Sequence, residues 1–191
     1  KGQIVDMIEQ SFQLSEASNT PVFYMMRVRG CHVTGEFVAK NNVAPEFGAK
    51  NSVTPNREAE KIILPPHVYQ QEQDKIAKRW PAAVDFIIKN KLNEFFPGKH
   101  KDLGIITLGG NYNTLIRALQ RQGLADSFGK TAIPIYVMNV AYPVVPEEMV
   151  EFCLGKKHVL LLEEGQPEYI EPAIHSILRK RDIQTKLYGK D

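Results

Sequence analysis

Two adjacent glycines and an asparagine follow a short apolar run near the middle of the sequence. The run from Leu103 to Leu108 leads into Gly109, Gly110 and Asn111, after which apolar residues recur at helical spacing. A glycine turn that opens a helix can bind an anion, because free N–H groups and the helix dipole converge there. No dinucleotide fingerprint or Walker sequence accompanies the turn. A structural turn, with glycine at positive φ and Asn111 or Asn113 as the helix cap, is therefore the favoured interpretation.

A pair of carboxylates, Glu163 and Glu164, follows another apolar run, Val159 to Leu162. Two carboxylates at the end of a strand can act as a general acid and a general base. Neighbouring side chains in an extended segment point to opposite faces, so at most one of the two faces a crevice. The other then stabilises the N-terminus of the next helix, and structural use of the pair is favoured over catalysis.

The remaining composition excludes several classes of function. Five histidines and two cysteines show no metal-ligand spacing, so we expect no metal site, and we expect Cys31 and Cys153 to be reduced structural residues. A total of 24 Lys and Arg against 22 Asp and Glu leaves no electrostatic footprint for nucleic acid or an anionic membrane. No apolar run approaches the roughly 20 residues of a membrane span, and the first residues are no signal peptide. We therefore expect a cytoplasmic protein.

These residues need an α/β scaffold to position them. Strands that alternate with helices predict a three-layer αβα fold with a mostly parallel sheet. The hydrophobic patterns predict strands at 22–28, 103–108, 133–140, 159–162 and 184–188 and helices at 4–17, 68–96, 146–154 and 168–181. A further helix contains Leu115, Ile116 and Leu119 and ends before Gly123. We expect a break near Trp80, because Pro81 interrupts the longest helix. The segment 30–60 is rich in Asn, Pro and Gly and is predicted to be a linker.

Ligands of such sheets usually bind beyond the carboxyl ends of the strands. The residues predicted at those ends are Gly109, Gly110, Asn111, Asn139, Tyr142, Glu163, Glu164 and Gln166. Three aromatic residues lie in this half of the chain: Tyr112, Tyr136 and Tyr142. A role in core packing is favoured for them over a role as a platform on which a ligand stacks.

Four stretches resemble the alpha part of indolepyruvate ferredoxin oxidoreductase, in particular the fused bacterial form. They are residues 62–69, 104–107, 141–148 and 159–171, and the last contains the specific pattern Glu-Glu-Gly-Gln-Pro-Glu after an apolar strand. The resemblance implies a thiamine diphosphate enzyme that decarboxylates aryl 2-oxoacids oxidatively to acyl-coenzyme A and passes electrons through iron–sulfur clusters to ferredoxin.

The same resemblance implies a division of the chain. Residues 1–38 resemble the end of a pyrimidine-binding domain, residues 39–100 a linker with a long helix, and residues 101–191 a transketolase C-terminal-like domain. In that family the sheet is mixed, with an antiparallel edge strand. Arg29 and His32 match a family Arg-x-x-His and can face an oxoacid carboxylate, although loop residues bonded to backbone carbonyls are the favoured alternative.

The sequence departs from the family in lacking its iron–sulfur cysteine motifs and its diphosphate- and magnesium-binding domain. We therefore expect no cofactor on this chain, with thiamine diphosphate, Mg²⁺, iron–sulfur clusters and coenzyme A bound elsewhere in a parent enzyme, and little activity of the chain alone. The expected partners are the remaining domains of that parent and ferredoxin. Two alternatives stay open, a free-standing nucleotide- or flavin-binding module that uses Gly109 and Gly110, and a protein-interaction module.

The first helix and strand cannot bury their own apolar faces. The candidates for exposure are Ile4, Ile8, Phe12, Phe23 and Met25. Such faces could form a patch larger than monomers usually tolerate. Either the long helix of residues 68–96 folds back over it or a second copy pairs through it, and we favour the homodimer.

Overall fold

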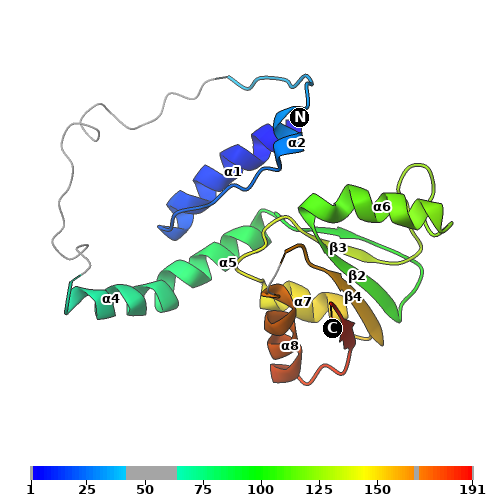
Figure 1. The fold of residues 1–191 in the computed structure, drawn as a ribbon. Coiled ribbons are helices and arrows are strands. Elements are labelled where there is room, and N and C mark those ends of the chain that lie inside the picture. Colours follow the sequence, from blue (N-terminus) through cyan, green and yellow to red (C-terminus); the bar gives the residue numbers. More distant parts are fainter. Residues whose placement is uncertain (1, 42–63, 166–167, 191) are drawn as a thin grey trace. The chain divides into compact units, whose positions relative to one another are not determined.

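The structure is a computed structural model that describes residues 2–41, 64–165 and 168–190. The chain divides into two compact units, Lys1–Ala83 and Val84–Asp191. Figure 1 shows both units with most of their helices and strands labelled. The described helices of the first unit are α1 (Gly2–Ser18), α2 (Val28–Cys31), α4 (His67–Asp74), a π-helical turn η2 (Lys75–Arg79) and the start of α5 (Trp80–Lys89).

The helix predicted over 4–17 is confirmed as α1, and Asn19 ends it at a positive φ of 49°. The strand predicted over 22–28 is not formed among the described residues. Residues 21–27 are extended but carry no strand pairing, and α2 begins at Val28. An extended segment becomes a strand only when its N–H and C=O groups pair with a neighbour, and the described part of this unit contains no second strand.

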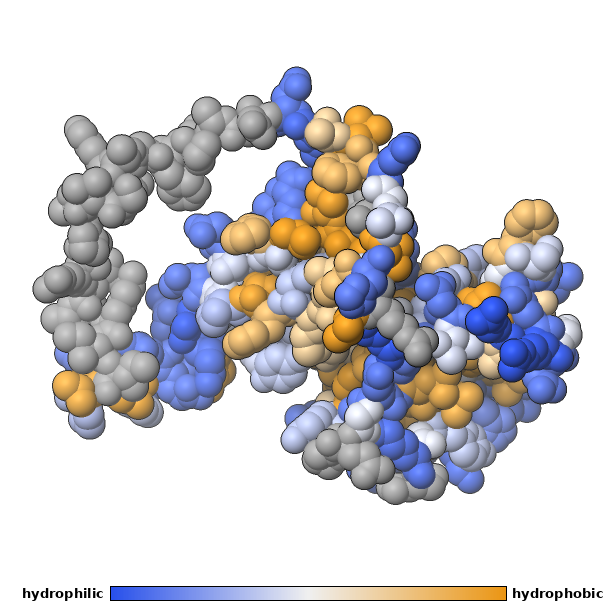
Figure 2. All heavy atoms as spheres, turned by 45° about the horizontal axis from the view of Figure 1, so that its top comes forward, coloured by the Kyte–Doolittle hydropathy of each residue, from blue (hydrophilic) through white to orange (hydrophobic). Residues whose placement is uncertain are grey.

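The extended segment leaves large apolar side chains exposed. Phe23 is 89% exposed and Met25 84%, and on α1 the Phe12 side chain is 71% exposed. Figure 2 shows hydrophobic surface gathered over this part of the chain. The predicted apolar patch is thus present, although Ile4 is half-buried in it.

The long helix predicted from residue 68 begins at His67 and continues through Pro81 to Lys89. The break expected near Trp80 takes the form of the π-helical turn η2, in which the Trp80 N–H bonds the carbonyl of Lys75. Such a turn changes the carbonyl partners just before Pro81, where the ring would otherwise clash with an α-helical backbone.

The end predicted for this helix is wrong, because residues 94–96 belong to a strand. Lys91 adopts a positive φ of 50°, and the Leu92 N–H returns to the Ile87 carbonyl, so the helix closes after Lys89. Glu94–Phe96 then forms β1, which pairs antiparallel with a later strand.

The second unit is built on a five-stranded sheet in the order β1-β3-β2-β4-β5. Its other strands are β2 (Leu103–Leu108), β3 (Ile135–Met138), β4 (His158–Leu162) and β5 (Lys186–Tyr188). Only the β1–β3 pair is antiparallel, and the register places Phe96 opposite Ile135 and Ile105 opposite both Ile135 and Leu160. The expected mostly parallel sheet with an antiparallel edge strand is confirmed.

Helices on both faces of the sheet complete three layers (Figure 1). They are α6 (Tyr112–Arg121), α7 (Pro146–Cys153) and α8 (Ile170–Lys180). Helix α6 buries its apolar face against Ile105, Ile135 and Val137, whereas α7 and α8 cover Ile106 and Met138 on the opposite face. The third strand of the prediction, β4, is buried only at alternate residues, and Leu160 stays 40% exposed.

The predicted strand–turn–helix unit around residue 109 is confirmed, with one correction. A 3₁₀ turn, η3 (Gly109–Asn111), connects β2 to α6. Neither Gly109 nor Gly110 has a positive φ, and Asn111 forms no side-chain cap. At the other end of α6, Gly123 has a φ of 70°, and the Leu124 N–H bonds the Leu119 carbonyl, as in a Schellman cap.

Candidate functional site at the carboxyl edge of the sheet

Parallel strands β2, β3 and β4 end at the same edge of the sheet, and most of the predicted site residues lie there. At the end of β3, the Asn139 side-chain amide donates to the Leu92 carbonyl at 3.0 Å and to Glu94 at 2.9 Å. An added Cβ at Gly109 would lie 2.5 Å from Asn139 Oδ1. Gly109 is therefore explained by the close approach of Asn139, which connects the ends of β1, β2 and β3.

A second polar cluster, which the sequence patterns missed, lies beside it. The Tyr136 hydroxyl and the Asn93 amide both donate to Oε2 of Glu148, the latter at 2.9 Å. Asn93 Oδ1 in turn accepts the Val140 N–H at 2.9 Å. Burial and the Glu148 carboxylate raise the pKa of Tyr136 well above its ordinary value of 10.0. The cluster keeps Tyr136 protonated and holds the segment before β1 against β3 and α7.

The carboxylate of Glu163 caps helix α8. Its Oε1 accepts the N–H groups of Tyr169 at 2.9 Å and Ile170 at 3.1 Å, and its Oε2 accepts that of Glu171 at 3.3 Å. A carboxylate at this place satisfies N–H groups that the helix itself leaves unpaired and complements the helix dipole. The neighbouring Glu164 is exposed, which agrees with opposite orientations of the two side chains.

The predicted aromatic residues behave differently from one another. Tyr112 stacks on Phe96 with ring centroids 5.1 Å apart, and Tyr136 is 4% exposed, so both are packing residues as expected. Tyr142 is 75% exposed, which contradicts its interpretation as a packing residue, because it lies on the turn between β3 and α7 beyond the reach of the core. Gln166 lies outside the described residues.

The other predicted site residues lie in the first unit. Arg29 belongs to α2, and His32 follows it as an exposed residue. No hydrogen bond of the His32 side chain is found within the described part of the chain, and the expected role of the Arg-x-x-His pair stays a prediction. Of the two cysteines, Cys153 is buried and Cys31 is exposed. Burial raises the pKa of the Cys153 thiol to about 11, consistent with a structural residue.

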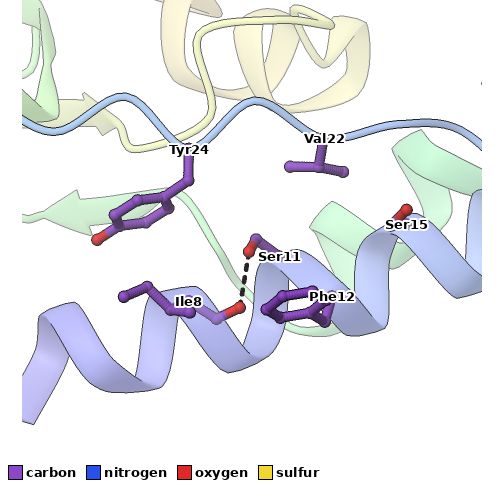
Figure 3. A pocket seen from close by; sticks show the side chains of 6 residues that line it. All are labelled: Ile8, Ser11, Phe12, Ser15, Val22 and Tyr24. Carbon is purple, nitrogen blue, oxygen red and sulfur yellow. Dashed lines mark hydrogen bonds between the residues drawn. The ribbon is translucent and has the colours of Figure 1, made fainter.

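A groove of about 360 Å³ lies between α1 and the extended segment that follows it. Figure 3 shows Ile8 and Phe12 of α1 with Val22 and Tyr24 of the segment around it. The hydroxyl of Tyr24 donates to the Ile4 carbonyl at 3.5 Å, and Ser11 bonds within its own helix. The groove is apolar and carries no titratable cluster among its lining residues.

Within residues 2–41, 64–165 and 168–190, no group of three or more His, Cys, Asp or Glu side chains is placed to hold a metal ion. No helix in this same part of the chain is both long enough and apolar enough to cross a bilayer.

The fold and its carboxyl edge define a three-layer α/β domain in which the carboxylates of Glu148 and Glu163 bind the domain's own side-chain and backbone donors. No family model matches the sequence. Over 98% of its length the chain is similar to two curated proteins named indolepyruvate oxidoreductase subunit IorA. It is 22% identical to that of Methanothermobacter thermautotrophicus and 25% identical to that of Methanothermobacter marburgensis. The resemblance that the motifs indicated is thereby confirmed, and the chain spans 29% of the length of each relative.

Proposed function

We propose that the chain is the part of a thiamine diphosphate-dependent aryl 2-oxoacid:ferredoxin oxidoreductase that connects and assembles its domains. In this proposal the parent enzyme is cytoplasmic, oxidises indolepyruvate to the acyl-coenzyme A and reduces ferredoxin. Residues 101–191 act as the transketolase C-terminal-like domain, residues 39–100 as the linker and residues 1–38 as the end of the pyrimidine-binding domain. The names of the two relatives and the 98% coverage of this chain support the parent class.

The structural use of the edge carboxylates is the observation that carries an assembly role. Glu163 accepts three backbone N–H groups of α8, and Glu148 accepts both Tyr136 and Asn93. These carboxylates are already bound to the domain's own donors. A diphosphate and its metal ion need ligand oxygens that point into an open site, so these side chains do not fit that role. We therefore assign the binding of thiamine diphosphate, Mg²⁺, iron–sulfur clusters and coenzyme A to other parts of the parent.

The exposed segment of the first unit supports the division of the chain. Residues 21–27 are extended, are rich in strand-forming side chains and have no strand partner among the described residues. We assign this segment as a strand that completes a sheet of the parent's pyrimidine-binding domain. Arg29 and His32 would then follow the end of that strand, where a guanidinium and an imidazole can bind the carboxylate of an oxoacid.

The nucleotide- or flavin-binding alternative depends on the turn at Gly109 and Gly110. The Asn139 side chain already explains Gly109, and neither Gly109 nor Gly110 has a positive φ. Isothermal titration of the chain with thiamine diphosphate plus Mg²⁺, and separately with ATP and flavin mononucleotide, tests this point. The assembly role predicts no saturable binding to any of them, and micromolar binding of a nucleotide would instead establish the alternative.

A fusion protein distinguishes a domain of the proposed parent enzyme from a general protein-interaction module. The chain is joined to the region that precedes its match in the Methanothermobacter thermautotrophicus relative, and amide hydrogen exchange is followed at residues 22–28. We expect fast exchange in the chain alone and strong protection in the fusion, because strand pairing satisfies the exposed N–H groups. Unchanged exchange in a folded fusion contradicts the assignment of a strand here. Protection in a concentrated solution of the chain alone would favour the homodimer through the apolar patch.

A further inference from the structure

Helix α4, the π-helical turn η2 and the first residue of α5 carry an exposed stripe that the proposed function does not use. Tyr69 is 69% exposed, Ile76 65% and Trp80 39%, and all three are large apolar or aromatic residues. Gln73 lies between them and donates to the Tyr69 hydroxyl at 2.8 Å, so both side chains share one side of the helix. The spacing of 69, 73, 76 and 80 alternates four and three residues, as in the contact seam of paired helices.

The stripe contains a hollow as well as a projection. Lys75, Ile76 and Trp80 line a shallow hollow of about 190 Å³, one helical turn beyond Gln73. Tyr69 projects from the same stripe two turns earlier. Helices pair by inserting a side chain of one into a space between side chains of the other. The stripe thus holds both a projecting aromatic side chain and a hollow that can receive one.

The charges along the stripe are arranged in two blocks of opposite sign. Glu72 and Asp74 precede its midpoint, and Lys75, Lys78 and Arg79 follow it. Their ion pairs within the helix, Glu72 with Lys75 at 2.6 Å and Asp74 with Lys78 at 2.9 Å, leave the Glu72 side chain 55% and the Lys78 side chain 80% exposed. A parallel copy of this helix would place like charges together, whereas an antiparallel copy places each block beside its opposite.

We propose that a second copy of this chain binds along α4 and η2 in antiparallel orientation, about a two-fold axis between Asp74 and Lys75. In this arrangement Tyr69 of each copy enters the hollow beside Ile76 and Trp80 of the other, and Glu72 meets Lys78 of the partner. The stripe is self-complementary, as a two-fold interface requires. The stripe covers only residues 69–80, which limits the contact to a few helical turns and makes the association weak and reversible.

Sedimentation equilibrium of the full chain up to high micromolar concentration tests the interface. We expect reversible dimers, and we expect Ile76→Lys to raise the dissociation constant at least about tenfold, because it places a charge in the hollow. Phe23→Ser, in the separate apolar patch of the first unit, is the matched control and leaves the dissociation constant unchanged. A strictly monomeric chain, or dimers that Phe23→Ser abolishes and Ile76→Lys preserves, overturns the proposal.

A charge exchange tests the antiparallel orientation. Glu72→Lys and Lys78→Glu each place like charges together across the two-fold axis and weaken the dimer severalfold. The double variant restores opposite charges, and we expect it to recover most of the lost affinity. Circular dichroism checks that each variant retains its helix content. Single variants without effect, or a double variant weaker than both, contradict the antiparallel pairing.

Discussion

The buried hydroxyl of Tyr136 offers a test of the polar cluster at the carboxyl edge. Tyr136→Phe removes the O–H that donates to Glu148 while the ring remains in the core between β3 and α7. A hydrogen bond to a charged group contributes about 1.5–3 kcal/mol, and Asn93 still donates to the same carboxylate. We therefore expect a loss near the lower end, about 1–2 kcal/mol in the free energy of unfolding at neutral pH.

The same variant changes the dependence of stability on pH. The folded-state pKa of Tyr136 is raised above 10.0, so its contribution to stability is fully present below pH 10 and declines as the pH rises further. In the wild type this decline is about 1.4 kcal/mol per pH unit until the folded-state pKa is reached. Tyr136→Phe lacks the ionisable group, so the stability difference between the two proteins shrinks by about 1.4 kcal/mol near pH 11.

Urea denaturation followed by far-ultraviolet circular dichroism measures both effects, at neutral pH and on either side of pH 10. Tyr169→Phe, at an exposed tyrosine of the same unit, is the matched control and changes stability by less than about 0.5 kcal/mol. Other groups that titrate in this range are common to both proteins and cancel in the difference. A difference between wild type and Tyr136→Phe that stays constant through pH 11 would refute the raised pKa, and a loss no larger than the control's would refute the hydrogen bond.

Three further substitutions test other contacts of the second unit by the same denaturation assay. Glu163→Ala removes the cap of α8 and is expected to lower the free energy of unfolding by about 1–2 kcal/mol. The control Glu164→Ala, at the exposed neighbour, lowers it by less than about 0.5 kcal/mol. Equal effects of the two variants would exclude the cap. Gly109→Ala directs a Cβ into the Asn139 amide and is expected to cost about 1–3 kcal/mol, so a neutral result would contradict the close approach. Gly123→Ala places a side chain at positive φ and should cost about 1 kcal/mol, and an increase in stability would contradict that backbone conformation.

Local sequence signals predicted most of the second unit. The apolar run of β2, the turn after it and Gly123 marked one strand–helix unit from start to end, because each signal acts over a few residues. The three-residue β1 was missed for the same reason. Phe95 and Phe96 continue the helical spacing of α5, so they were included in the predicted helix. The helix ends because Lys91 adopts a positive φ, and a lysine at this position is not a sequence signal for a helix end.

The polar clusters of the carboxyl edge were only partly predictable. That one carboxylate of the pair Glu163–Glu164 stabilises the next helix followed from their place just before it, which is local information, although the sequence did not say which of the two does so. The contact between Asn93 and Glu148 joins residues 55 positions apart, and neither residue type nor spacing indicates such a pairing. A different reason explains why the strand predicted at 22–28 is not formed. The composition of this segment favours a strand, but a second strand that could pair with it is not among the described residues.

The order of strands in the sheet also constrains how the protein is made. Edge strand β1 pairs only with β3, and β2 and α6 lie between them in the chain. During synthesis from the N-terminus, β1 leaves the ribosome with no strand to pair with until β3 has followed. Until then Phe95 and the open edge of β1 are available to other chains, which is the hazard of an unpaired strand. The brevity of β1 limits this hazard, since three residues offer few hydrogen bonds to a wrong partner.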